Sequence, residues 1–172
     1  MMLPNRRSEE WKWTDLRRLV QAPYVKKASP ASDAEIDRLV ASSPLADVKA
    51  SRAVFVNGIY DARRSRVLQG KLSAPAQLAD DTIVAIGNRL EPQGVSLALE
   101  GNADLPVEIL HVATSGPQRA MAFRHAVTIA DGAAVTLIET FVGEGDYLCN
   151  AVVEISVGKG ARLDRIKIER ES

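Results

Sequence analysis

Hydrophobic residues recur from residue 97 onward in three segments that share one frame. Each segment has an apolar residue, two variable positions, Gly or Asn, then Ala, one variable position and a second apolar residue. The segments are Leu99–Asn102–Ala103–Leu105, Ile129–Gly132–Ala133–Val135 and Val157–Gly160–Ala161–Leu163. Their starts lie 30 and then 28 residues apart. A period of this length indicates structural units that stack on one another.

Each segment predicts two short strands joined by a tight corner. Apolar alternation extends upstream to Leu97, Val127 and Ile155, and downstream to Val107, Leu137 and, less regularly, Arg165. Gly or Asn stands where we expect a positive φ, and the Ala that follows is small enough to point into a stacked interior. The repeat therefore predicts a mainly β chain that forms the start of a parallel β-helix over residues 83–172. A β-sandwich whose hairpins share similar turns by chance stays open as the alternative.

The first 52 residues predict a small helical region before the repeat. Ser8 can cap a helix that carries Glu9 and Glu10 in its first turn and stops at Pro23. A second helix begins after Ser32, because a Glu follows three residues later, as in a capping box. Its buried stripe consists of Ile36, Leu39 and Val40, and it closes at Ser43-Pro44.

A hairpin and a connecting segment are expected between these two regions, over residues 53–82. The apolar residues 53–56 and 59–60 flank Asn57-Gly58, a pair that readily takes the positive φ angles of a type I′ turn. The polar stretch that starts at Arg63 is ambiguous, and we assign it no structure.

Charge and composition exclude several classes of protein. Lys and Arg number 22, as do Asp and Glu, which argues against a dedicated binder of nucleic acid or anionic membranes. Hydrophobic residues make up 46% and charged residues 26%, which is typical of a globular domain rather than a disordered chain. The single cysteine excludes an internal disulfide and fits a reducing compartment. We therefore expect a soluble, cytoplasmic protein.

The residue types that most often carry chemistry do not form a site in the sequence. Cys149 lacks cationic neighbours and further ligands, so we interpret it as a structural residue. His111 and His125 are fourteen residues apart, which matches no common metal spacing, and we expect each to be hydrogen-bonded or on the surface. We predict no catalytic, cofactor-binding or metal-binding residue.

Other short motifs also have ordinary interpretations. The glycine pairs at 143–145 and 158–160 lack the third glycine of a dinucleotide loop. The acidic pair Asp80-Asp81 and the basic run at 63–66 are expected in solvated loops. A polysaccharide-cleaving β-helix needs carboxylates clustered on one face, and Asp131 and Glu139 are not evident in the sequence as such a pair. Trp11 and Trp13 point about 200° apart on a helix, so one is expected to pack inward while the other can meet a partner.

Four motifs in the same order resemble SufD-type proteins. They are residues 7–16 (RSEEWKWTDL), residues 55–58 (FVNG) with Tyr60-Asp61, residues 127–133 with 137–139, and residues 150–164. The resemblance implies a right-handed parallel β-helix after an N-terminal helical region. It also implies a non-enzymatic scaffold that assembles iron–sulfur clusters with SufB and the ATPase SufC. A carbohydrate-active or carbohydrate-binding β-helix is the alternative function.

The chain stops at Ser172, inside what the resemblance implies is the β-helix. We therefore expect a shortened form of a family protein, without the distal β-helix that pairs with SufB and the C-terminal helical domain that docks SufC. The family's histidine implicated in cluster building has no counterpart here, so the cluster is expected to be handled by the full complex rather than bound by this chain. A β-helix interrupted in this way leaves strand edges uncovered, which predicts self-association.

Overall fold

The computed structural model describes residues 31–66, 87, 90, 92–102, 105–117 and 119–171 of the 172-residue chain. Several predictions fall outside these residues: the helix after Ser8, the two tryptophans, Asp80-Asp81 and the corner alanine at position 103.

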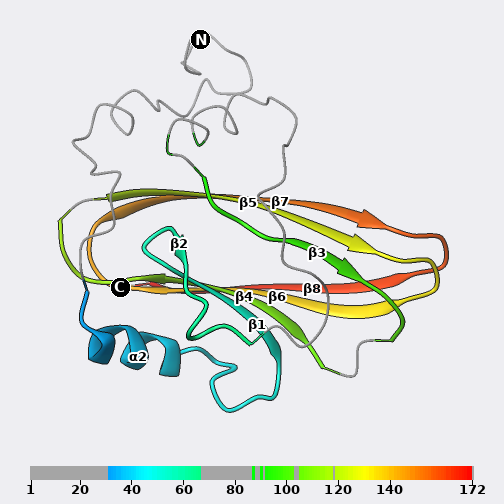
Figure 1. Ribbon diagram of the computed structural model, residues 1–172, viewed down its shortest axis with the longest axis horizontal. Coiled ribbons are helices and arrows are strands. Elements are labelled where there is room, and N and C mark those ends of the chain that lie inside the picture. Colours follow the sequence, from blue (N-terminus) through cyan, green and yellow to red (C-terminus); the bar gives the residue numbers. More distant parts are fainter. Residues whose placement is uncertain are drawn as a thin grey trace, which may run out of the picture.

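The described part of the chain is mainly β and forms two sheets, which lie one above the other in Figure 1. The five-stranded sheet has the order β2 (Ile59–Tyr60), β1 (Ser51–Val56), β4 (Val107–Ala113), β6 (Ala134–Gly143), β8 (Arg162–Glu171). The three-stranded sheet has the order β3 (Ser96–Leu99), β5 (Arg119–Ile129), β7 (Tyr147–Val157). The chain changes sheet with every strand from β3 to β8, so strands next to each other in one sheet are parallel.

The register of these strands confirms the repeat. Leu99 pairs with Ile129, and Ile129 pairs with Val157, so the spacings of 30 and 28 residues are also the offsets between neighbouring strands. In the other sheet Val135 pairs with Leu163. Since these pairs are parallel, the alternative of a sandwich built from antiparallel hairpins is wrong for β3 to β8.

The space between the two sheets holds the main core. Alternate residues of each strand point into it, as the two-residue period of a strand requires. Its fully buried members come from β1, β3, β4, β5, β6 and the residues beside them: Ala53, Phe55, Val95, Leu97, Leu99, Val107, Ile109, Ala113, Met121, Phe123, Val127, Ile129, Ala133, Val135 and Leu137. We call the face of each sheet that looks at the other sheet its core side.

The corners agree with the prediction in two repeats and differ in the first. Gly132 and Gly160 have φ angles of 70° and 68°, as expected. In the first repeat the positive φ belongs to Gly101, at 67°, and not to Asn102, which forms a bridge with Ala134. The prediction for Asn102 is wrong because the glycine just before it adopts the left-handed region without a Cβ clash.

Helix α2 (Asp33–Ala41) begins where the sequence predicts. The Oγ of Ser32 accepts a hydrogen bond of 3.1 Å from the backbone N–H of Glu35. The Glu35 carboxylate instead accepts bonds from the backbone N–H and the hydroxyl of Ser115, at 2.7 and 2.6 Å. It therefore fastens α2 to the loop after β4 as well as marking the start of the helix.

The outer face of the five-stranded sheet packs against α2. Leu39 lies in a second buried cluster with Val54, Leu110, Val112 and Val142. The predicted hairpin is confirmed beside this cluster, because Asn57 and Gly58 have φ angles of 49° and 89° and Phe55 pairs with Tyr60.

The predicted right-handed β-helix is confirmed only as far as two parallel sheets. The described strands do not make a closed solenoid. Within the same residues, no helix is long and apolar enough to cross a membrane.

Candidate functional site

The last two strands form the most exposed part of the two-sheet body, and we call residues 147–157 and 162–171 the β7–β8 edge. Among the described strands, β7 is paired only with β5, and β8 only with β6. The apolar side chains of this edge that pack against the core are only partly buried: Tyr147, Cys149, Ala151, Val153, Ile155 and Leu163. Every residue of β4, by contrast, is buried. The backbone groups on the outer side of β7 and β8 are thus available for a further strand.

The core side of β8 is charged, which gives the edge two different halves. Arg165 continues the row of Val107 and Leu137, and its Nε donates to the buried carboxylate of Glu139 at 2.7 Å. Lys167 lies 2.5 Å from a carboxylate oxygen of Glu169, and its Nζ lies 4.9 Å from the centre of the Phe141 ring. The edge therefore presents apolar residues on β7 and charges of both signs on β8.

Sequence reasoning missed this charged row, although a signal was present. Arg165, Lys167, Glu169 and Glu171 alternate with a period of two, at positions where the repeat frame expects core residues. In the apolar row of the repeat, Arg165 is only an irregular member. The remaining member, Glu171, accepts a hydrogen bond of 2.6 Å from the Tyr147 hydroxyl.

Cys149 lies on β7 and packs against the core cluster. Burial, with a further contribution from the carboxylate of Glu171, raises the pKa of its thiol to about 12. Since the thiolate is the form that attacks sulfur or binds a metal, this thiol is unreactive at neutral pH.

His125 is hydrogen-bonded, as expected, whereas His111 is neither hydrogen-bonded nor on the surface. Both lie between the sheets, with 4% and 0% of their surface exposed. Neither nitrogen of His111 has a hydrogen-bond partner, and Nε2 of His125 has none. His125 is hydrogen-bonded only through Nδ1, which accepts from the backbone N–H of Val95 at 3.2 Å. Burial lowers the pKa of both imidazoles.

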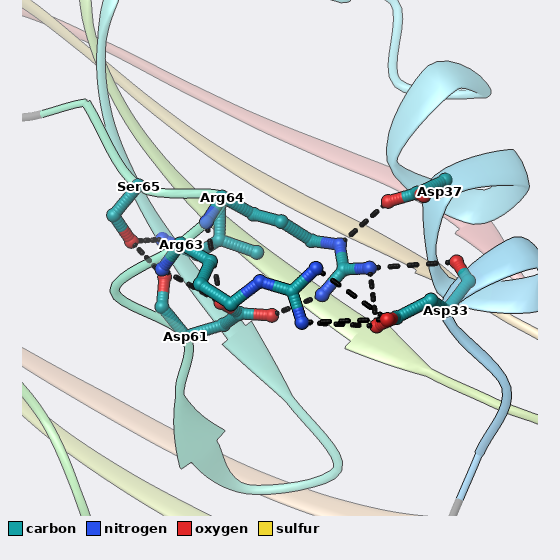
Figure 2. A network of polar contacts seen from close by, with 7 residues as sticks. Asp33, Asp37, Asp61, Arg63, Arg64 and Ser65 are labelled. Carbon is teal, nitrogen blue, oxygen red and sulfur yellow. Dashed lines mark hydrogen bonds and ion pairs between the residues drawn. The ribbon is translucent and has the colours of Figure 1, made fainter.

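The basic run at 63–66 forms ion pairs with other residues of the chain, chiefly through Arg64. Figure 2 shows the Arg64 guanidinium between helix α2 and the turn after the hairpin. It bonds to Asp37 at 2.7 Å, to Asp33 at 2.9 Å and to Asp61 at 2.7 Å. These three carboxylates, Asp37 first, raise the pKa of the guanidinium, and Arg64 in turn lowers the pKa of Asp33. Arg64 is thus a clamp for α2, whereas its neighbour Arg63 is largely exposed and reaches Asp33 at 3.3 Å.

The remaining candidates also take structural positions. Gly143 ends β6, and the adjacent Glu144 accepts two bonds from Arg38 of α2, at 2.7 and 2.8 Å. Asp131 accepts a hydrogen bond of 2.7 Å from the backbone N–H of Lys159 at a corner between strands. It therefore has a structural partner of its own, whereas Glu139 is buried between the sheets. Across the described residues, no group of three or more His, Cys, Asp or Glu side chains is placed to hold a metal ion.

Comparison with known proteins adds two findings. Residues 111–172 match the family described as "SUF system FeS cluster assembly, SufBD core domain". The chain is also 26% identical, over 99% of its length, to the iron–sulfur cluster assembly protein SufD of Escherichia coli (strain K12). The two matches support assignment of the chain to the SufD family. The chain spans 43% of the length of the Escherichia coli SufD that it matches.

The SufBD core match coincides with the repeat. It starts near the end of β4 and includes β5, β6, β7 and β8. The SufBD core match therefore falls on the part of the chain that alternates between the two sheets and on the β7–β8 edge.

Proposed function

We propose that this chain is a scaffold subunit of SUF iron–sulfur cluster assembly that acts with SufB and SufC in the cytoplasm. The observation that carries the proposal is the SufBD core match over residues 111–172, which falls on the two-sheet repeat. A scaffold needs a rigid body and a surface that other subunits can extend. The stacked strands supply the body, and the β7–β8 edge supplies such a surface.

The same observations support a right-handed parallel β-helix as the architecture of the complete repeat. Strands alternate between two sheets, offsets of 28 to 30 residues recur, and glycine occupies the corners. Each lap would cover the edge of the lap before it, which is how solenoids gain stability.

We propose a role in organising the assembly rather than in catalysis. The raised pKa of Cys149 keeps its thiol protonated, and the buried histidines are out of reach of a substrate. The cluster is then cargo that the full complex builds, and this chain contributes shape and contacts. A carbohydrate-active β-helix would instead need accessible carboxylates on adjacent laps, whereas Glu139 is buried beneath Arg165.

Co-purification tests the proposal. A full-length protein that contains this sequence is expressed with an affinity tag together with SufB and SufC from the same organism, and retention of either protein on it is the expected result. The matched control is the same protein with Leu137→Asp, which disrupts the core and removes the surface. A folded full-length protein that retains neither SufB nor SufC would contradict the proposal, and hydrolysis or tight binding in a polysaccharide screen would favour the alternative.

We also infer that the β7–β8 edge pairs with a second copy of the chain when no other strand covers it. The observation is the charge order along the core side of β8, which is self-complementary. Antiparallel pairing of two β8 strands about Ile168 places Lys167 opposite Glu169 of the second copy, and Arg165 opposite Glu171. Opposite charges that face each other across strands contribute about 0.2–1 kcal/mol each.

Charge exchange tests this pairing. Lys167→Glu alone places like charges opposite each other and should shift the chain toward monomer in light scattering. The double variant Lys167→Glu/Glu169→Lys restores opposite charges and should restore the dimer. A wild-type chain that stays monomeric at high concentration, or a double variant no better than the single one, would contradict the pairing.

A further inference from the structure

The two histidines of the chain meet each other between the sheets. The sequence contains two in all, His111 on β4 and His125 on β5. Their ring centres are 5.2 Å apart. Because Nδ1 of His125 accepts the Val95 N–H, its proton resides on Nε2, which finds no acceptor. Three imidazole nitrogens are thus buried without a partner, a costly arrangement that requires an explanation.

The pair is enclosed by aromatic rings. His111 stacks on Phe141, with 4.4 Å between the ring centres, and packs at a tilt against Phe123, with 4.3 Å between the ring centres. The centre of the Phe55 ring lies 5.7 Å from that of His111 and 5.2 Å from that of His125, so Phe55 packs beside both imidazoles. These five rings come from β1, β4, β5 and β6, and they join the two sheets at one place.

Among the residues that the structure describes, no unpaired carboxylate lies beside the pair to compensate a positive charge on it. Lys167 of β8 lies over Phe141, and Arg124 precedes His125 on β5, and both positive charges disfavour a proton on the imidazoles. Glu139 is the one carboxylate of β6, and it already forms an ion pair with Arg165. Two further carboxylates lie on the core side of β8, where Glu169 pairs with Lys167 and Glu171 accepts a bond from the Tyr147 hydroxyl. Further titratable side chains on the packed elements are Tyr60 on β2, Arg119 on β5, and Tyr147 and Cys149 on β7.

We propose that His111 and His125 form an acid-sensitive joint between the two sheets, which opens when either imidazole takes up a proton. The folded joint holds both rings neutral among aromatic carbon. A protonated imidazole needs water or a carboxylate, and this site offers it neither. Opening would give the ring access to water and separate β4 from β5 around the aromatic cluster.

The direction of the pH effect follows from the folded and unfolded pKa values. Burial lowers the pKa of His125 from 6.5 to about 3, and it lowers that of His111 well below 6.5. The unfolded chain therefore binds more protons than the folded chain below pH 6.5, so stability is complete above that pH and falls as the pH drops toward about 3. Carboxylates with lowered pKa, such as Asp33 and Glu35, lose their contribution only below their ordinary values of 3.8 and 4.5. The range from pH 7.5 to 5.5 thus isolates the two histidines.

Urea unfolding of the 172-residue chain at pH 7.5 and 5.5 measures the effect. With an unfolded pKa of about 6.5 for each histidine, the ratio of folded to unfolded chain should fall about 100-fold between the two pH values. His111→Phe removes no hydrogen bond, and His125→Asn keeps an acceptor for Val95. Each single variant should reduce the loss to about 10-fold, and the double variant should abolish it. Glu144→Gln, an exposed carboxylate, is the control and should retain the full loss.

Two outcomes would overturn the proposal. One is a wild-type chain with equal stability at both pH values, and the other is a His111→Phe chain that keeps the 100-fold loss. Where a variant fails to fold, NMR of the unchanged protein decides: the imidazole Cε1–H signals of the folded state should not titrate between pH 7.5 and 5.5, and titration near 6.5 would contradict the joint.

Hydrogen exchange tests whether the opening is local. The protection factor of the Val95 amide, which bonds to His125, should fall at pH 5.5 before that of Val135, which lies six residues from Phe141 along β6. Equal loss of protection at both amides would contradict a joint and indicate unfolding of the whole body.

Discussion

Strands β4 and β7 have similar patterns on their core sides but very different exposure. All seven residues of β4 are buried, because β1 and β6 flank it and α2 covers its outer face. None of the eleven residues of β7 is fully buried, although Val153 and Ile155 point into the same core. Hydrophobic alternation therefore sets which way a side chain points, and the next strand in the stack sets how much water it loses.

Strand β8 differs from the covered strand β4 even more than β7 does. Its rows continue those of Leu137 and Phe141, yet they carry Arg165 and Glu169 at the corresponding positions. Charged residues are tolerated there because their ends reach water beyond the last strand, as Arg165 does with 46% of its side chain exposed. The covered strands contribute most of the stability of the fold, and the edge strands provide the surface for contacts with other chains.

Removing the same side chain from both regions gives the largest contrast. Leu137 is fully buried in β6, whereas Leu163 on β8 is partly exposed. We expect Leu137→Ala to lower the free energy of unfolding by about 3–5 kcal/mol and Leu163→Ala by about 1 kcal/mol. Urea unfolding at pH 7.5 measures both, and equal losses would show that the last lap is as well covered as the inner one.

A second contrast compares buried and exposed carboxylates. Glu108 is fully buried on the outer face of β4 and accepts bonds from Ser43 and Thr140, each at 2.8 Å, and an ion pair from Arg52. Glu108→Gln should cost about 2–4 kcal/mol, because it leaves Arg52 without its charge partner. Glu169→Gln on the β8 edge should cost less than about 0.5 kcal/mol. A similar loss for both in thermal unfolding would contradict the contrast.

The smallest effect separates two neighbouring arginines. Arg64 has 10% of its side chain exposed and bonds three aspartates, while Arg63 has 74% exposed. Arg64→Gln should destabilise α2 by about 1–2 kcal/mol, seen as faster amide exchange in residues 33–41. Arg63→Gln, the matched control, should change exchange by less than about 0.5 kcal/mol. Equal effects would mean that the clamp in Figure 2 contributes nothing beyond surface charge.

Features set by local chemistry or by the period were predictable from the sequence. The 28- and 30-residue spacings predicted the strand register, Ser32 predicted the start of α2, and Asn57-Gly58 predicted the hairpin. These depend on neighbours in the chain or on a repeated pattern, so they need no knowledge of the packing.

Features that depend on which strands meet were not predictable. His111 and His125 are fourteen residues apart and meet only because their strands lie in different sheets. The hydrogen bond that the Ser115 hydroxyl donates to Glu35 joins residues 80 apart. The candidate edge was likewise expected only in general terms, and its charged half became visible once the register placed Lys167 and Glu169 on the core side.

Disulfide trapping tests the stacking most directly. Thr128 and Ser156 are exposed, lie on neighbouring parallel strands and pair in register, so cysteines at both positions fall within disulfide range. On a Cys149→Ala background, Thr128→Cys/Ser156→Cys should oxidise fully to an intramolecular disulfide. Thr128→Cys/Glu154→Cys, shifted by two residues on the same exposed face, should stay largely reduced. Preferential oxidation of the shifted pair, or of neither, would contradict repeats stacked in the 28-residue register.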